Sequence, residues 1–364
     1  MAGAFPRSQV GELASLSFLL FLLTCLLASA CVARAAADAV PSPTIWSVGN
    51  SLGHVEVRDE LPSPSTFFDE YLHPEKPVLF REAAKRMPAF ARWTDKYLRE
   101  RHGHVHLDQV ETEKKETRLK YPKDDWTLSR FLSEYNTSDV YSTAATPRGL
   151  SDEVYLLPVL NCGGFTKRMS QSVLWFSSGS TKSVIHQDGQ HNIHCMFAGE
   201  KHWILWRPDS GINTAAMGWV TAEEEAKTDP AFKDAYGTFA GRIDVDSVDV
   251  KRYPGWERLH WWSLTLRAGD CAFIPSAWFH YVEAPPQRSI SVHVWFHSGK
   301  EFDRKSCTKL EGRGFNLSRF MIRLSDCSWG FGEDGKRKPT KCKRHRSLPF
   351  ADGGEEPAKL PDEL

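Results

Sequence analysis

The stretch Ala268-Gly-Asp-Cys-Ala-Phe-Ile-Pro-Ser-Ala-Trp-Phe-His280 decides how this chain is expected to fold. A Gly-Asp turn leads into a short apolar run from Cys271 to Ile274, a proline ends the run, and a histidine follows. Turn residues on both sides of a short apolar run predict a buried β-strand. In a double-sheet β fold, strands that are distant in sequence lie side by side, so His280 can meet ligands from elsewhere in the chain.

A second stretch, Ser183-Val-Ile-His-Gln-Asp-Gly-Gln190, supplies two more side chains that bind metals. His186 and Asp188 are two residues apart, so in a strand they project from the same face. Two imidazoles and one carboxylate are the ligand set of non-haem Fe(II) oxygenases, which keeps coordination positions open for a co-substrate and oxygen. A His-X-Asp pair alone arises by chance in many chains, so the predicted metal site depends on His280 joining it.

Short apolar runs between turn signals recur through the second half of the chain. The predicted strands are 155–157, 172–176, 184–186, 193–197, 202–206, 264–266, 271–274 and 290–296. This spacing predicts a mainly β protein, a double-stranded β-helix or jelly roll with its barrel core at about 154–298. A polar, partly helical insert at 210–262 interrupts the barrel.

Flanking segments carry helical patterns. A capping residue before an apolar periodic run predicts a helix at 63–71, and apolar periodicity alone predicts helices at 90–101 and 127–135. A further helix is predicted at 309–324 in the tail. Residues 77–80 read as a short strand. The highly charged segment 110–123 is expected to be a solvated loop or an exposed hairpin.

The N-terminus has the pattern of a secretory signal peptide. A basic start is followed by an apolar run from Leu13 to Leu27 and small residues, so cleavage is expected after residue 30 or 37. The predicted organisation is a signal peptide at 1–37, a mobile lead-in at 38–62, an oxygenase domain at 63–298 and a C-terminal extension at 299–364. The apolar run is shorter than the roughly 20 residues of a membrane span, and no later run is long enough.

The cysteines and the sequons fit the expected secretory route. One disulfide is expected among Cys307, Cys327 and Cys342, whereas Cys195 and Cys271 lie in predicted core strands and are expected to be buried thiols. No CxxC pair is present, which argues against structural zinc. The sequons at Asn136 and Asn316 are candidate glycosylation sites.

The C-terminal extension ends in Asp-Glu-Leu, which matches the last three residues of an endoplasmic-reticulum retrieval signal, although Pro361 stands where Lys or His is usual. We therefore expect the lumen of the endoplasmic reticulum, with secretion as the alternative. The basic run 336–346 is expected to be a solvated, disordered tail. Acidic and basic residues balance at 46 each, so no global field indicates nucleic acid.

The stretch 268–280 resembles the closing motif of the JmjC-domain Fe(II)/2-oxoglutarate oxygenases, with Phe279 in place of the second Trp of the usual Trp-Trp-His. Residues 198–208 are similar to the family strand that carries the co-substrate lysine, and 243–254 to its acidic segment. Upstream elements look like those of the small hydroxylase-type members. The resemblance covers roughly residues 63–298.

The resemblance implies an enzyme that uses Fe(II), 2-oxoglutarate and O₂. It implies His186, Asp188 and His280 as metal ligands, with no catalytic residue beyond them. Lys201 would bind the distal carboxylate of 2-oxoglutarate, and Asn192 and Ser183 would line the same pocket. His293 stands where hydroxylase members often have Asn, and His191 and His194 are expected to be pocket or loop histidines.

The expected activity is hydroxylation of side chains in proteins or peptides of the secretory pathway. Two alternatives stay open: N-methyl-lysine demethylation by the same iron chemistry, and a non-catalytic JmjC-like protein that binds a partner. A cupin that uses zinc or manganese is a more distant reading. The sequence decides neither the substrate nor the oligomeric state.

Overall fold

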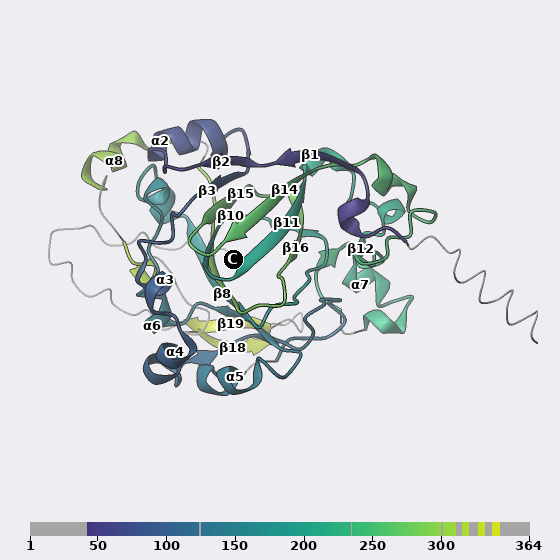
Figure 1. Ribbon diagram of the computed structural model, residues 1–364, viewed down its shortest axis with the longest axis horizontal. Helices are drawn as coiled ribbons and strands as arrows, with labels where there is room; N and C mark the ends of the chain where they lie inside the picture. The colour runs from purple at the N-terminus through teal and green to yellow at the C-terminus, as the bar shows by residue number, and fades with distance from the viewer. Residues whose placement is uncertain are drawn as a thin grey trace, which may run out of the picture.

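Two facing β-sheets form the body of the molecule in the computed structural model (Figure 1). It describes residues 42–310 except 124, 234 and 300, together with 315–319, 327–331 and 337–342. Side chains from both sheets meet between them in an apolar cluster that includes Met196, Trp203 and Ile274. The predicted mainly β jelly roll is confirmed.

The smaller sheet has five strands and the larger has eight. The order in the smaller sheet is β1 (Asn50–His54), β14 (His260–Arg267), β11 (Glu200–Trp206), β16 (Phe279–Glu283) and β9 (His186–Gln187). The order in the larger sheet is β2 (Glu56–Arg58), β3 (Val78–Phe80), β15 (Cys271–Ile274), β10 (His191–Ala198), β17 (Ser289–Phe296), β8 (Met169–Ser177), β7 (Tyr141–Ala145) and β5 (Val110–Glu111). Three two-stranded pairs are β4 (His106–Leu107) with β6 (Trp126–Thr127), β12 (Val220–Thr221) with β13 (Thr238–Phe239), and β18 (Cys327–Phe331) with β19 (Arg337–Cys342).

The two faces of the larger sheet carry different side chains. On β10, Ile193, Cys195 and Phe197 belong to the main hydrophobic cluster, which the flanking helices complete. The alternate residues Asn192 and His194 therefore point the other way, into the space between the sheets, because side chains alternate along a strand. The fold thus lines the barrel interior with polar groups at the level of β10.

Helices cover the outer face of the larger sheet, and the insert with α7 lies at the opposite end of the view (Figure 1). The α-helices are α2 (Pro64–Phe67), α3 (Pro88–Arg92), α4 (Asp95–His102), α5 (Leu128–Glu134), α6 (Arg148–Ser151), α7 (Ala222–Glu225) and α8 (Arg304–Leu310). A π-helical turn, η2 (Phe68–Leu72), continues α2. Short 3₁₀ turns are η1 (Ile45–Ser47), η3 (Pro158–Leu160), η4 (Phe165–Lys167), η5 (Pro208–Ser210), η6 (Ala215–Met217), η7 (Pro230–Phe232), η8 (Pro254–Arg258) and η9 (Leu317–Arg319).

Hydroxyl caps set where these helices begin. Ser63 and Thr127 each accept a hydrogen bond from the backbone amide three residues later, as the predicted starts of α2 and α5 require. The single helix predicted at 90–101 is wrong. Its residues divide between α3 and α4, because Trp93 leaves the helical conformation and Thr94 caps a new start.

Several strand predictions also need correction. Residues 155–157 form no strand, although their apolar side chains are buried or half-buried; only Tyr155 makes an isolated bridge, to Asn316. The unpredicted strands include β7 and β16, and β16 contains His280 itself. The metal ligand therefore lies within a paired strand and not in a loop beyond one.

Both ends of the described chain are more ordered than predicted. The lead-in predicted to be mobile contains β1 and β2, which pair in parallel with β14 and β3. In the tail, α8 starts at Arg304 and ends at Leu310, and Leu317–Arg319 form the 3₁₀ turn η9. The rest of the helix predicted at 309–324, residues 311–314 and 320–324, lies outside the described residues. Part of the basic run, 337–342, forms β19 and is not a disordered tail. The predicted signal peptide and the Asp-Glu-Leu end lie outside the described residues.

The structure contains two disulfides among the described side chains, and neither pairing was predicted. Cys307 bonds to Cys162, whereas a bond between Cys327 and Cys342, which are opposite each other on β18 and β19, stays a prediction because their side chains lie outside the described part of the chain. Cys195 and Cys271 are not free thiols, because they are directly opposite each other on β10 and β15 and form a second disulfide. Over the described ranges, no helix has both the length and the apolar character needed to cross a membrane.

Candidate metal centre and co-substrate pocket

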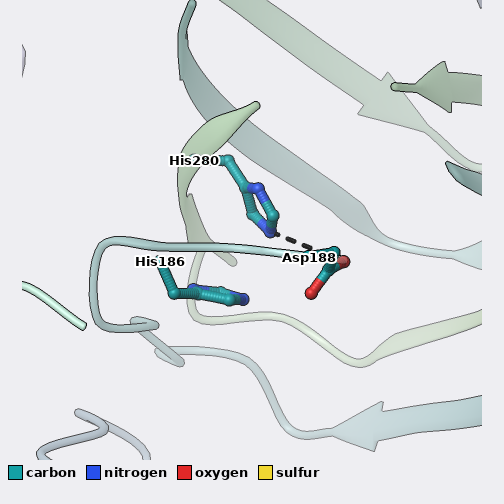
Figure 2. Close-up of side chains that lie close together, drawn as sticks. All are labelled: His186, Asp188 and His280. Atoms are coloured by element: carbon teal, nitrogen blue, oxygen red, sulfur yellow. Dashed lines mark ion pairs between the residues drawn. The ribbon is translucent and has the colours of Figure 1, made fainter. Parts of the chain in front are cut away.

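The three predicted metal ligands converge at one edge of the smaller sheet (Figure 2). His186 on β9 and His280 on β16 are direct partners in an antiparallel ladder, and Asp188 follows β9. One ligand atom of each residue lies within 4.8 Å of the other two, and His280 Nε2 is 4.0 Å from Asp188 Oδ2. This is the spacing of groups that can share one metal ion, with two nitrogens and one oxygen as donors.

Both imidazoles are oriented by backbone carbonyls. The Nδ1–H of His186 donates to the Val184 carbonyl at 2.8 Å, and that of His280 donates to the Trp278 carbonyl at 3.0 Å. These bonds leave Nε2 of each ring free for a metal, which is how metal-binding histidines are usually held. Burial, with His280 and Arg118 nearby, lowers the pKa of His186 well below its ordinary value, so its ring stays in the neutral, metal-binding form.

The carboxylate of the site has a fixed partner as well. Trp295 on β17 donates its indole N–H to Asp188 Oδ2 at 3.1 Å. The Ala277 amide donates to the Asp188 backbone carbonyl at 2.7 Å, which ties this residue to the loop before β16. Sequence reasoning did not identify Trp295, although its strand places it on the same face as His293.

Lys201 lies inside the barrel with no acidic partner among the described residues. Its side chain is 6% exposed, and its ammonium nitrogen is 4.9 Å from the centre of the Trp175 ring. Burial lowers the pKa of Lys201 to about 7. A buried cation without a counter-charge is costly, and a bound dicarboxylate would supply that charge.

Four polar atoms in the same interior lack hydrogen-bond partners within the described part of the chain. They are Asn192 Oδ1, His194 Nδ1, His293 Nε2 and Trp203 Nε1. Buried polar atoms of this kind usually have a partner, so together with Lys201 they fit a polar ligand between the sheets. The donor set and this lining fit an iron centre with 2-oxoglutarate beside it.

The structure connects the remaining predicted residues to the site in different ways. Asn192 Nδ2 donates to His293 Nδ1 at 3.3 Å, so both face the interior. Ser183 uses its hydroxyl oxygen to accept from the Val282 amide at 2.9 Å, a contact at the sheet edge, and its co-substrate role stays a prediction. His194 bonds to Ser291, whereas His191 accepts from the Ser276 amide and so joins the start of β10 to the loop before β16.

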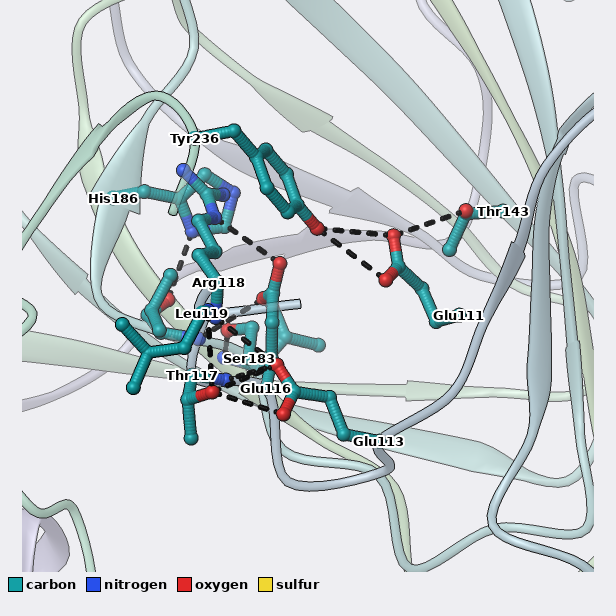
Figure 3. Close-up of polar contacts among 12 residues, drawn as sticks. Glu111, Glu113, Glu116, Thr117, Arg118, Leu119, Thr143, Ser183, His186 and Tyr236 are labelled. Atoms are coloured by element: carbon teal, nitrogen blue, oxygen red, sulfur yellow. Dashed lines mark hydrogen bonds and ion pairs between the residues drawn. The ribbon is translucent and has the colours of Figure 1, made fainter. Parts of the chain in front are cut away.

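The charged segment predicted to be solvated contains buried carboxylates beside the metal site (Figure 3). Glu111 is 3% exposed and Glu113 is 6% exposed. Glu116 accepts from the Val184 amide at 3.1 Å, two residues before a metal ligand. Sequence reasoning missed these residues because nothing in a run of acidic and basic side chains marks which ones are buried.

Comparison with known proteins places this arrangement in a family. The family model described as "Cupin-like domain" matches residues 64–302, which is most of the chain. The human protein named "Bifunctional peptidase and (3S)-lysyl hydroxylase JMJD7" is 23% identical over 279 residues, which cover 69% of this chain and 86% of that protein.

Other relatives match over a smaller part of their own length. "Lysine-specific demethylase 8" of Xenopus tropicalis is 23% identical over 244 residues, 65% of this chain and 51% of that protein. "Jumonji C domain-containing protein 5" of Drosophila melanogaster is 32% identical over 124 residues, 34% of this chain and 26% of that protein. The chain belongs to the Cupin-like domain family, as a JmjC-type member of the oxygenases that use Fe(II), 2-oxoglutarate and O₂.

Proposed function

We propose that this protein is a 2-oxoglutarate-dependent hydroxylase of protein side chains that works in the lumen of the endoplasmic reticulum. The observation that carries the proposal is the pairing of His186, Asp188 and His280 with the buried, uncompensated ammonium of Lys201. The first set can hold iron, and the second can hold a dicarboxylate beside it. Bound iron would couple oxidative decarboxylation of 2-oxoglutarate to hydroxylation of a substrate C–H bond.

The protein's own residues provide position and surroundings for this chemistry. The Val184 and Trp278 carbonyls orient the two imidazoles, and Trp295 fixes the carboxylate. Lys201 gives the co-substrate a single charged anchor inside the barrel. The apolar cluster with Met196, Leu205 and Leu264 closes the space between the sheets, which keeps water from that part of the interior.

The proposed compartment is supported by three features of the chain. Its leader has the pattern of a secretory signal, and its last three residues match a retrieval signal. Asn136 and Asn316 are both exposed, as glycan acceptors must be. Two disulfides within the described residues fit an oxidising lumen.

The test is release of succinate from 2-oxoglutarate by the purified full chain with Fe(II) and O₂. We expect turnover by the natural protein, none by His186→Ala, and normal turnover by His73→Ala, which replaces an exposed histidine remote from the ligands. Lumenal proteins incubated with the enzyme should gain the mass of one oxygen atom. An iron-loaded, folded protein that never consumes 2-oxoglutarate, even with lumenal extract, would refute the proposal.

Demethylation of N-methyl-lysine is the second candidate, favoured by the printed name of the Xenopus tropicalis relative. It predicts formaldehyde release from methylated peptides. Turnover of methylated peptides without any hydroxylated product would reverse the order of the two candidates.

A further inference from the structure

A cavity of about 540 Å³ lies in the insert between β11 and β14. The turns η6 and η8 supply most of its lining, which includes the three arginines Arg242, Arg252 and Arg258. Neither the three metal ligands nor Lys201 line this arginine cavity, so it is separate from the candidate iron centre. Guanidinium groups bind carboxylates and phosphates through paired hydrogen bonds, so the lining suits a negatively charged ligand.

Buried packing fixes the frame of the arginine cavity. Trp256 donates its indole N–H to the Met217 carbonyl at 3.2 Å, which joins η8 to η6. The Trp256 ring is 1% exposed and packs edge to face with Trp206 at the end of β11, with ring centres 5.7 Å apart. The arginines therefore extend from a preformed frame, which lowers the cost of ordering the site when a ligand binds.

Two of the three arginines have no acidic partner. Arg242 forms an ion pair with Glu225, so its charge is already balanced. Arg252 lies over the ring of Tyr253, 5.2 Å from the ring centre. Within the part of the chain that the structure describes, no carboxylate forms an ion pair with the side chain of Arg252 or Arg258. Two guanidinium groups at the cavity are thus available to a ligand.

The acidic residues nearest in sequence leave this positive charge in place. Asp249 accepts a hydrogen bond from the backbone amide of Arg252 at 3.0 Å, and so shapes the turn before η8. Glu257 is exposed and makes no ion pair among the described side chains. Residues 251–258 hold three basic side chains, Lys251 among them, against one acidic side chain, which is a net charge of +2. This surface therefore attracts anions.

The arginine cavity is open to solvent. Five of its lining residues are exposed: Ala215, Ala216, Arg252, Pro254 and Arg258. A site for a small molecule normally encloses most of its ligand, which this one does not. An open cavity with cations at its rim suits a chain segment that lies across it, because acidic side chains along the segment can each meet one guanidinium group.

We infer that the arginine cavity binds an acidic peptide segment of a partner protein, with Asp or Glu carboxylates of the segment paired to Arg252 and Arg258. The inference goes beyond the proposed function, because this binding needs neither iron nor 2-oxoglutarate. Met217 and Tyr253 belong to the same buried cluster as Phe279, the residue before a metal ligand on β16. A bound partner would therefore be attached to the same packed body as the iron centre.

The first test measures binding by fluorescence anisotropy. Fluorescent peptides with one neutral sequence and three central Glu, Gln, Lys or phosphoserine residues are titrated against the full chain. We expect the Glu peptide to bind about tenfold or more tightly than the Gln and Lys peptides, and this preference to weaken as salt is added. The preference should disappear in the double variant Arg252→Gln with Arg258→Gln. It should persist in Lys96→Gln with Arg101→Gln, which removes two exposed cations from α4.

The double variant Arg252→Glu with Arg258→Glu separates a binding effect from a failure of folding. A folded protein with these changes should reverse the preference and bind the Lys peptide more tightly than the Glu peptide. Equal binding of the Glu and Gln peptides by the natural protein would overturn the inference, and so would a preference that survives in the Gln double variant. Binding of the phosphoserine peptide alone would also overturn it, because the cavity would then recognise phosphate.

The second test uses the natural protein and no variant. Hydrogen exchange is followed by mass spectrometry with and without a saturating amount of the Glu peptide. We expect slower exchange in residues 251–258, which line and flank the arginine cavity, and no change in α4. Protection confined to other parts of the chain would place the acidic segment elsewhere and overturn the inference.

Discussion

Glu111 should give the stability of the protein a pH dependence of its own. Burial, with Glu116 nearby, raises the pKa of Glu111 from 4.5 to about 7, so the folded state favours the protonated carboxyl group. Its contribution to stability is therefore full below about pH 4.5 and is lost as the pH rises through 7. By pH 8 the loss amounts to about 3 kcal/mol.

Glu111→Gln should remove this dependence. We expect the variant to match the natural protein near pH 4.5 and to be more stable by about 3 kcal/mol at pH 8. Urea unfolding across this range measures the difference, in which the contributions of other titrating groups cancel. A variant that is less stable at every pH would mean that the Glu111 carboxyl group stabilises the fold in both of its protonation states.

Trp295 is expected to control the affinity of the iron site. Trp295→Phe keeps the ring but removes the N–H that donates to Asp188, so we expect iron affinity to fall about 10- to 100-fold. Trp175→Phe is the matched control, because its indole N–H donates to His293 and not to a metal ligand. Iron titration of both variants without 2-oxoglutarate checks this, and equal affinities would contradict it.

Lys201 is expected to decide co-substrate binding without affecting iron. Replacing Lys201 with Met removes the ammonium that would face the dicarboxylate, and we expect 2-oxoglutarate to bind about 100-fold more weakly. Calorimetry with 2-oxoglutarate measures the loss, and iron titration is the control. Unchanged 2-oxoglutarate affinity would show that another group anchors the co-substrate.

At the scale of elements, the disulfide between Cys162 and Cys307 attaches α8 to the segment between η3 and η4. It joins residues 145 apart, and the second disulfide, which spans 76, lies within that loop. Closing a long loop restricts the unfolded chain, so Cys162→Ser with Cys307→Ser should cost about 4 kcal/mol of stability. Thermal unfolding of the double variant measures this, with unchanged 2-oxoglutarate turnover as the control. An unchanged midpoint would mean that α8 needs no covalent attachment.

The helices and strands that have a clear local sequence pattern were predicted, and those without one were missed. The sequence of β17 alternates clearly between apolar and polar side chains, and the cap Ser63 marks the start of α2. β7 was not predicted because its sequence, Tyr141-Ser-Thr-Ala-Ala145, contains no run of large apolar side chains. The apolar run 155–157 was predicted as a strand because burial alone does not distinguish a strand from a buried turn.

The sequence likewise predicted some residues of the candidate site and not others. Its metal ligands have a recognisable spacing, and the sequence predicted all three residues that the fold brings together. Glu111 has no such signal, because its burial depends on contact with Tyr236, which lies 125 residues further along the chain. Contacts made only in the tertiary structure cannot be read from a charged segment.

For the whole molecule, the proposed lumenal address predicts glycosylation. Asn136 and Asn316 are exposed in sequons, so protein expressed with its own leader should lose mass on treatment with a glycosidase that removes N-linked glycans. Asn136→Gln and Asn316→Gln should each remove one part of the shift, and the double variant all of it. A full-length protein that carries no glycan and has reduced cysteines would place it outside the secretory pathway.

The two-residue strand β9 has a consequence for iron supply. Its ladder with β16 has just two pairs, one of which joins His186 to His280. Iron would therefore crosslink β9 to the barrel. The two residues before β9 hold neighbouring segments in place, because Glu116 accepts from the Val184 amide and the Ala240 amide donates to the Ile185 carbonyl. In a cell short of iron, these segments would be held less firmly and would become the first targets of proteases.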